Sequence, residues 1–237
     1  REKDGPYRTR LFTSLEGISS VPAVARKGED YARQEAQEEA KRCLQCECLE
    51  CVKVCAYLER FKGYPKKYAR EIYNNESIVM GTRHANKLIN SCSLCGLCEE
   101  LCPNDFAMQD LCLNARRSMV RRGKMPPSAH EFTLLDMEFS RSDRFALARH
   151  QPGRTAGARV FFPGCQLCAS APRQVRRAYD HLCRSFPDGV GLILGCCGAP
   201  AYWAGEEAGF QREVDTLRDK WIGLDRPTII LACSTCY

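Results

Sequence analysis

The chain has 237 residues, a formal net charge of +6 and 17 cysteines. This length allows one or two domains. The number of cysteines is odd and far larger than in an ordinary cytosolic chain, whereas dense disulfide frameworks belong to short secreted chains. Basic residues are scattered among acidic ones without a sustained basic face rich in aromatics, which argues against nucleic-acid binding.

The N-terminal region carries neither a signal peptide nor an apolar run of membrane length. We therefore expect a protein without a membrane span, located in a reducing and anaerobic cytoplasm. Residues 1–26 contain Gly, Pro and Ser without periodicity, which predicts an extended leader or linker. Because the chain begins without Met and ends at Tyr237, directly after a cysteine, we expect it to be part of a longer protein.

The most informative motif reads Cys92-x2-Cys95-x2-Cys98-x3-Cys102-Pro103. Bacterial-type ferredoxins use this run to hold [4Fe–4S] clusters, and its fourth cysteine normally binds a second cluster. A zinc site takes four ligands, usually in pairs, and would leave the trailing cysteine and proline unexplained. The motif therefore predicts an iron–sulfur cluster and calls for a second run elsewhere in the chain.

An earlier run supplies it, with the spacing Cys43-x2-Cys46-x4-Cys51-x3-Cys55. An alternative reading, in which Cys48 takes part, remains open. Because the x3 spacing directs each trailing cysteine away from its own loop, we expect the two runs to exchange their last ligands. The predicted ligands are Cys43, Cys46, Cys51 and Cys102 for the first cluster, and Cys92, Cys95, Cys98 and Cys55 for the second.

Helical spacing is common between residues 27 and 150, which predicts a helical domain that holds the two clusters. The helix expected after Pro103 has an apolar stripe that contains Cys112, which we interpret as a buried core thiol. Basic side chains near the end of this helix suit the helix dipole and predict a solvated helix end. They are Arg116, Arg117, Arg121 and Arg122.

The following helix is expected to bury one face made by Phe132, Leu135 and Phe139. The composition then changes at residues 151–157, which we interpret as a domain boundary. The second domain, residues 157–237, is expected to be small, of the α/β type and truncated at its C-terminus. The overall fold class predicted for the chain is α+β.

Three short apolar strands, expected at 158–162, 190–194 and 228–232, alternate with amphipathic helices in this second domain. That alternation predicts a parallel sheet. Each strand is followed by cysteines, and the ligands of open α/β sheets bind at the carboxyl ends of the strands. We therefore expect five thiols to converge at one edge of the sheet: Cys165, Cys196, Cys197, Cys233 and Cys236.

Glycines flank these cysteines at Gly164, Gly195 and Gly198, where a missing Cβ is expected to let the backbone approach a bulky inorganic core. Two more cysteines remain in this domain. Cys183 lies on the apolar stripe of a helix and is interpreted as a core residue. Cys168 follows the first strand closely and is either a core residue or a supplementary ligand.

Three of these segments resemble the cysteine-rich CCG domain of heterodisulfide reductases: 161–165 (FFPGC), 195–198 (GCCG) and 233–236 (CSTC). Joined to a helical two-cluster ferredoxin, the order is similar to the fused D subunit, or to a C-type subunit followed by a B-type subunit. The iron–sulfur subunits of glycolate oxidase and anaerobic glycerol-3-phosphate dehydrogenase are similar in layout. The chain departs from this family in carrying one CCG motif where such subunits usually carry two.

The resemblance implies that the five converging cysteines hold a non-cubane [4Fe–4S] cluster, and that this cluster is the catalytic centre at which a disulfide is reduced. It also implies an electron-transfer subunit fed through two cubane clusters. No dinucleotide-binding fingerprint is present, so a flavin-containing or other redox partner is expected. Three alternatives remain: a pure electron relay to a quinone or another acceptor, a zinc-stabilised docking scaffold, and a thioredoxin-like dithiol at Cys233 and Cys236. Whether the chain is itself an enzyme stays open.

Overall fold

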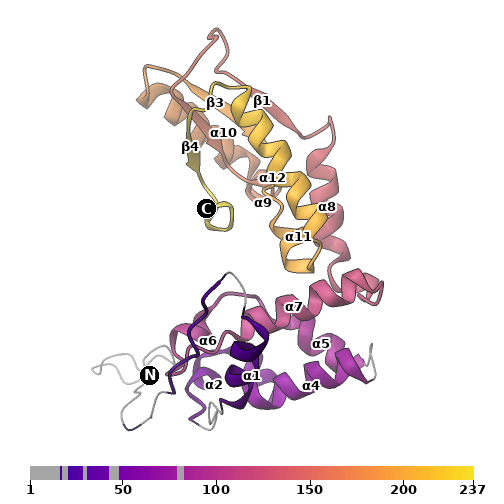
Figure 1. Ribbon diagram of the computed structural model, residues 1–237. Coiled ribbons are helices and arrows are strands. Elements are labelled where there is room, and N and C mark those ends of the chain that lie inside the picture. Colours follow the sequence, from indigo (N-terminus) through magenta and orange to yellow (C-terminus); the bar gives the residue numbers. More distant parts are fainter. Residues whose placement is uncertain (1–16, 18–20, 29–30, 43–47, 79–82) are drawn as a thin grey trace, which may run out of the picture. The chain divides into compact units, whose positions relative to one another are not determined.

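The computed structural model describes residues 17, 21–28, 31–42, 48–78 and 83–237. The chain divides into two compact units, Arg1–Met125 and Pro126–Tyr237 (Figure 1). The first unit is helical and the second combines helices with a four-stranded sheet, which confirms the predicted α+β class. None of the helices in the described ranges combines the length and the apolar character of a membrane span.

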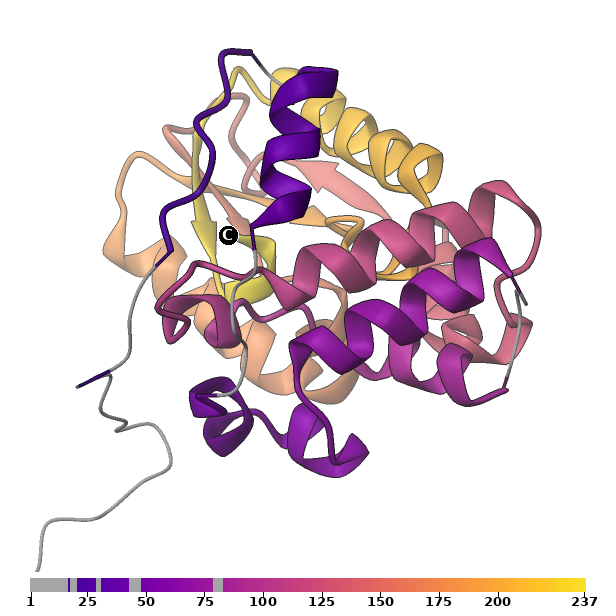
Figure 2. The ribbon, with the colours of Figure 1, turned by 60° about the horizontal axis from the view of Figure 1, so that its bottom comes forward.

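The first unit is built from short helices around one apolar core. Helices α4 and α5 both pack against α7, and α4 lies side by side with α7 (Figure 2). Their facing side chains, among them Tyr68, Leu88 and Met119, are almost completely removed from solvent. The helices of this unit are α1 (Arg33–Lys41), α2 (Glu50–Val54), α3 (Ala56–Phe61), α4 (Pro65–Ser77), α5 (Arg83–Ser91), α6 (Leu97–Glu100) and α7 (Met108–Arg121).

The described part of the predicted leader is attached to this unit. The backbone N–H of Val21 donates a hydrogen bond to Asn104 Oδ1 over 2.5 Å, and the Arg42 guanidinium donates to the Val21 carbonyl over 2.8 Å. Residues 21–26 have no regular secondary structure. Most of the predicted leader, residues 1–16 and 18–20, lies outside the described residues.

The second unit contains one mixed sheet whose strand order is β1-β3-β2-β4. Strand β2 pairs in parallel with both β3 and β4, while β1 pairs antiparallel with β3. The three predicted strands and their parallel pairing are therefore confirmed. The elements are η1 (Pro127–Ala129), α8 (Glu131–Arg141), β1 (Leu147–Arg149), β2 (Arg159–Phe162), α9 (Cys165–Ser170), α10 (Pro172–Ser185), β3 (Val190–Leu194), α11 (Ala199–Ala204), α12 (Glu207–Ile222), β4 (Thr228–Leu231) and η2 (Ser234–Cys236).

Successive residues of β2 point to opposite faces of the sheet, and each face has its own core. Val160 and Phe162 belong to the cluster that includes Leu217 of α12. Phe161 belongs to the cluster that includes Val175 of α10. Helices α12 and α10 therefore cover opposite faces, and the strands run between two helical layers.

The boundary between the two compact units lies in the sequence between Met125 and Pro126. The sequence predicted a first domain that extends to residue 150. The difference arises because α8 packs against α11 and β1 pairs with β3. Strand β1 could not be recognised in the sequence, since three residues are too few to show an alternating pattern.

The buried face of α8 also differs from the prediction. Phe132, Leu135 and Phe139 are 75%, 62% and 54% exposed, while Met137 and Ser140 are buried. Both sets recur at helical spacing, so periodicity alone could not decide which face is covered. Packing against α11 decides it.

The buried face of the sheet allows a direct test of the fold. Ile193 on β3 is completely buried beside Val160 and Phe162, so Ile193→Ala should lower the free energy of unfolding by about 2–5 kcal/mol. Ile229→Ala on the edge strand β4, where the side chain is 39% exposed, should cost clearly less. Urea unfolding followed by circular dichroism measures both variants. Equal losses would contradict the assigned core.

Candidate metal centres

The second cysteine run follows α5 and leads into α6. The loop passes through two residues with left-handed backbone, Leu94 at φ 57° and Gly96 at φ 76°. A glycine adopts this conformation without strain, while a leucine does so only where the surroundings enforce it. The loop places Cys98 at the second position of α6, where it is buried, and leaves Cys95 exposed.

The first run has the same local geometry where it is described. Leu49, at φ 59°, precedes α2 as Gly96 precedes α6, and Cys51 takes the second helical position as Cys98 does. Helices α2 and α6 also pack against each other. The two loops are therefore structural counterparts.

This equivalence extends to the flanking cysteines. Cys55 follows Cys51 at the spacing at which Cys102 follows Cys98, and Cys48 takes the position that corresponds to Cys95. The two remaining predicted ligands of this run, Cys43 and Cys46, lie outside the described residues. The reading of the first run that includes Cys48 therefore stays open.

A cysteine of the first run lies beside the three leading cysteines of the second. Burial raises the pKa of Cys98 to about 11, and a hydrogen bond from the Met108 backbone opposes this shift. The neighbouring thiols that raise it further are Cys55, Cys92 and Cys95. These four are the residues that the sequence predicted as ligands of the second cluster.

The surplus thiol Cys112 is completely buried in the same core, as predicted. It is hydrogen-bonded to Cys92, and this bond lowers the pKa of Cys92 to about 6. The Tyr57 hydroxyl lies 3.8 Å from the Cys112 sulfur. Two polar groups, the Cys112 thiol and the Tyr57 hydroxyl beyond it, thus lie near Cys92 inside an otherwise apolar core.

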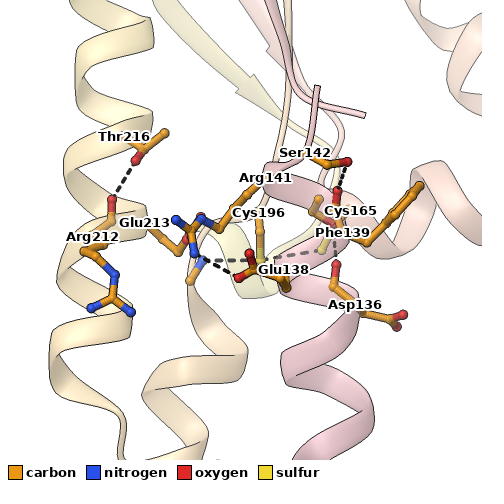
Figure 3. Close-up of polar contacts among 12 residues, drawn as sticks. Asp136, Glu138, Phe139, Arg141, Ser142, Cys165, Cys196, Arg212, Glu213 and Thr216 are labelled. Carbon is orange, nitrogen blue, oxygen red and sulfur yellow. Dashed lines mark hydrogen bonds and ion pairs between the residues drawn. The ribbon is translucent and has the colours of Figure 1, made fainter. Parts of the chain in front are cut away.

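In the second unit, all five predicted cysteines lie at the carboxyl ends of the parallel strands. Cys165 and Cys196 come within 3.7 Å of each other at their sulfur atoms (Figure 3). Cys197 is hydrogen-bonded to Cys196 and Cys236, and Cys236 in turn to Cys233. The thiols form one continuous series across the ends of three strands.

Neighbouring thiols in this series differ in acidity. Hydrogen bonds with Cys196 and Cys236 lower the pKa of Cys197 to about 3, and the hydrogen bond between Cys165 and Cys196 lowers that of Cys165 to about 7. The same bonds raise the pKa of Cys196 and Cys236. Metals bind thiolates and not thiols, so the lowered pKa values of Cys165 and Cys197 favour the form that binds a metal.

Two of the three flanking glycines are required by the geometry. A Cβ on Gly164 would lie 3.2 Å from the Cys236 sulfur, and Gly164 has φ 84°. A Cβ on Gly198, at φ 88°, would lie 2.9 Å from Cβ of Glu213. At Gly195 a Cβ would make only an ordinary contact, so the protein's own atoms do not require glycine there.

An ion pair lies next to the turn that contains Gly198. The Arg141 Nε of α8 is 3.0 Å from the Glu213 Oε1 of α12 (Figure 3), and Glu213 lies against Gly198, two residues after Cys196. Glu213 is buried, and burial raises its pKa while the Arg141 charge lowers it. The pair joins α8 to α12 beside the site. The sequence did not reveal it, because its two residues are far apart in the chain and belong to no motif.

A cavity of about 530 Å³ opens beside Cys197 and Cys236. Its walls are largely apolar and include the aromatic side chains of Tyr202, Trp203 and Trp221. The sequence did not reveal these residues, because aromatic side chains on α11 and α12 cannot be distinguished in the sequence from those of a helix face that packs into a core. The cavity gives an apolar approach to two of the five cysteines.

The other two cysteines of this unit pack into a core of the sheet. Cys183 and Cys168 both contact the cluster around Phe161 and Val175, which agrees with the interpretation of Cys183 as a core residue. Burial raises the pKa of Cys168, and the neighbouring Cys165 adds to that effect. Cys168 thus lies near the series of thiols without a described hydrogen bond to it.

The donor set suits a cluster that is bound through sulfur. The described residues contain no group of three or more Cys, His, Asp or Glu side chains placed for a single metal ion. The five thiols present sulfur donors only, two of them have lowered pKa values, and Gly164 leaves room that a Cβ would fill. Iron–sulfur clusters are held by such thiolates.

Comparison with known proteins assigns both units. Residues 42–107 match the family described as a 4Fe-4S dicluster domain, and residues 159–237 match the family described as a cysteine-rich domain (CCG). The chain thus joins a 4Fe–4S dicluster domain to a cysteine-rich domain. This is the combination that the resemblance to heterodisulfide reductase subunits predicted.

One similar protein is the B subunit of the fumarate reductase (CoM/CoB) from Methanothermobacter marburgensis, which is 26% identical over 242 residues. The match includes 95% of this chain but 46% of the relative, so the chain spans about half of the relative's length. No solved structure matches the chain.

The close approach at Gly198 leads to a prediction. In Gly198→Ala the added Cβ would meet Glu213 and Phe210, both at 2.9 Å, in a backbone conformation that alanine rarely adopts. We expect the free energy of unfolding of the metal-free chain to fall by roughly 1–3 kcal/mol. Gly195→Ala, which meets the Lys220 Nζ only at 3.5 Å, is the matched control. If both variants unfold at the same urea concentration, the close approach has no energetic weight.

Proposed function

We propose that the chain is an iron–sulfur electron-transfer subunit of a heterodisulfide reductase-like oxidoreductase complex. Two cubane [4Fe–4S] clusters would pass electrons to a non-cubane cluster at the five cysteines of the second unit. The observation that carries this proposal is the convergence of those five thiols from three strand ends. The match to a 4Fe-4S dicluster domain supports the cubane part.

In the first unit the protein's role is to hold ligands at fixed positions and to exclude water. The burial of Cys51 and Cys98 at equivalent helical positions supports one cluster behind each loop. The proximity of Cys55 to Cys98 supports the exchange of trailing ligands. We assign Cys43, Cys46, Cys51 and Cys102 to one cluster, and Cys92, Cys95, Cys98 and Cys55 to the other.

In the second unit the protein supplies thiolates and an approach to them. The backbone N–H of Gly198 donates to the Cys196 sulfur over 3.4 Å, and hydrogen bonds of this kind tune the potential of a cluster. The aromatic cavity beside Cys197 and Cys236 would admit an electron acceptor, for which a disulfide is our first choice. The cysteines assigned to this cluster are Cys165, Cys196, Cys197, Cys233 and Cys236.

The remaining parts of the proposal concern the setting. We assign the electron supply to a flavin-containing or other redox partner, because the sequence has no dinucleotide-binding fingerprint. Clusters held by many thiolates are best maintained in reducing surroundings, so we place the protein in an anaerobic cytoplasm. Electron relay to a quinone without disulfide chemistry remains the second candidate, because the chain carries one CCG motif only.

Metal analysis separates this function from a zinc-stabilised scaffold. The full chain, purified anaerobically, should contain iron and acid-labile sulfide for three four-iron clusters. Cys197→Ala should lower the iron and sulfide content by the amount of one cluster. The control Cys183→Ala should leave the iron and sulfide content unchanged. If Cys197→Ala removes zinc and no sulfide, the scaffold is correct for this unit.

The exchange of ligands is tested by electron paramagnetic resonance of the reduced chain. Cys98→Ala should remove the signal of the second-run cluster. If Cys55 belongs to that cluster, Cys55→Ala should leave the same residual spectrum as Cys98→Ala. A residual spectrum equal to that of Cys51→Ala would show that each run keeps its own fourth ligand.

Cys48→Ala decides the reading of the first run in the same experiment. Loss of the first-run signal in this variant would make Cys48 a ligand. An unchanged spectrum would leave Cys43, Cys46 and Cys51 as the ligands from the first run.

A further inference from the structure

Arg116 of α7 is buried, with 1% of its surface exposed. Its Nε and Nη2 donate to the Ile89 carbonyl over 3.0 and 2.9 Å, and Nη2 also donates to the Cys92 carbonyl over 2.5 Å. The sequence predicted a solvated helix end here. Arg116 instead points inward to the last turn of α5 and to the start of the second cysteine loop.

A buried guanidinium is costly, because its charge is removed from water. Carbonyl oxygens accept the hydrogen bonds from its Nε and Nη2. The Ile89 carbonyl is one of the last acceptors of α5, which lack partners within the helix. Neither carbonyl carries a net charge. The bonds to Ile89 and Cys92 therefore hold the guanidinium in the core without bringing a negatively charged group to it.

The groups around this charge are sulfurs and a phenol. The positive charge of Arg116 favours the ionised form of Cys92 and of Cys112, and Cys92 and Cys112 are hydrogen-bonded to each other. Tyr57 lies beyond them, with its hydroxyl near the Cys112 sulfur. The charge of Arg116 thus acts at Cys92, one of the three thiols that lie near Cys98.

We propose that Arg116 raises the reduction potential of the [4Fe–4S] cluster bound by Cys92, Cys95, Cys98 and Cys55. The inference rests on the proposed function, which assigns a cluster to these residues. Reduction adds one electron, and a fixed positive charge at short range in a poorly hydrated core stabilises the more negative state. Net charge and hydrogen bonds near the sulfurs are two of the factors that set cluster potentials.

The competing explanation is structural: Arg116 closes the C-terminal end of α5 and does nothing to the cluster. Both explanations predict that loss of Arg116 destabilises the unit, so stability cannot separate them. The reduction potential can, because a purely structural cap would not alter it in a variant that keeps its clusters.

The test uses the full chain, purified anaerobically, in a potentiometric titration with dithionite and mediators, followed by electron paramagnetic resonance. Arg116→Gln keeps hydrogen-bond donors and removes the charge. At a fixed potential we expect the reduced-to-oxidised ratio of one cubane to fall roughly tenfold, which corresponds to about 59 mV for one electron. Arg121→Gln, an exposed arginine on the same helix, is the matched control and should leave the ratio unchanged.

Iron and sulfide are measured in every sample. An unchanged potential in Arg116→Gln at wild-type iron content overturns the inference and leaves the proposed function intact. A wild-type chain without iron and sulfide defeats the proposed function itself. If Arg116→Gln loses iron, Arg116→Lys decides, because lysine keeps the charge and loses the two-armed hydrogen bonding. If Arg116→Lys keeps its iron and the wild-type potential, the positive charge sets the potential, as proposed. If Arg116→Lys loses iron or has a lowered potential, the proposed effect of the charge is overturned.

Discussion

The gathering of thiols that are far apart in the sequence is the constraint on which both units depend. Ionised sulfurs repel one another, and burial further disfavours their charge. Hydrogen bonds between neighbouring thiols offset this free-energy cost. Examples are the bonds from Cys196 and Cys236 to Cys197 and the bond from Cys112 to Cys92. A protonated sulfur beside an ionised one replaces repulsion by a hydrogen bond. The backbone must then hold the sulfurs close enough for these bonds to form.

The two units achieve this proximity by different means. In the helical unit, left-handed residues such as Leu49 and Gly96 turn the chain sharply into a short helix and place one cysteine in the core. In the second unit, the parallel strands end at one edge, so cysteines that follow different strands become neighbours. The first solution is local and leaves a motif of regular spacing. The second depends on the whole sheet and leaves only the strand-then-cysteine pattern.

This difference explains what could be predicted from the sequence. The spacing of Cys92 to Cys102 indicated cluster binding, and the apolar strands before Cys165 and Cys196 indicated their meeting place, because both signals are carried by consecutive residues. The antiparallel strand β1, the exposed face of α8 around Phe132 and the domain division at Met125 could not be predicted, since they depend on which helix faces are covered. The Arg141–Glu213 pair was missed for the same reason.

The two thiol sites also differ in the charged side chains that lie near them. Next to Gly198, the positive charge of Arg141 meets the carboxylate of Glu213, so the pair contributes little net charge while it fixes α8 against α12. Beside Cys92, Arg116 is held by the carbonyls of Ile89 and Cys92, which carry no net charge. The first arrangement mainly fixes geometry. The second acts on any group that gains negative charge within its reach. Within a relay, such a charge would favour the presence of an electron at the cluster of the second cysteine run.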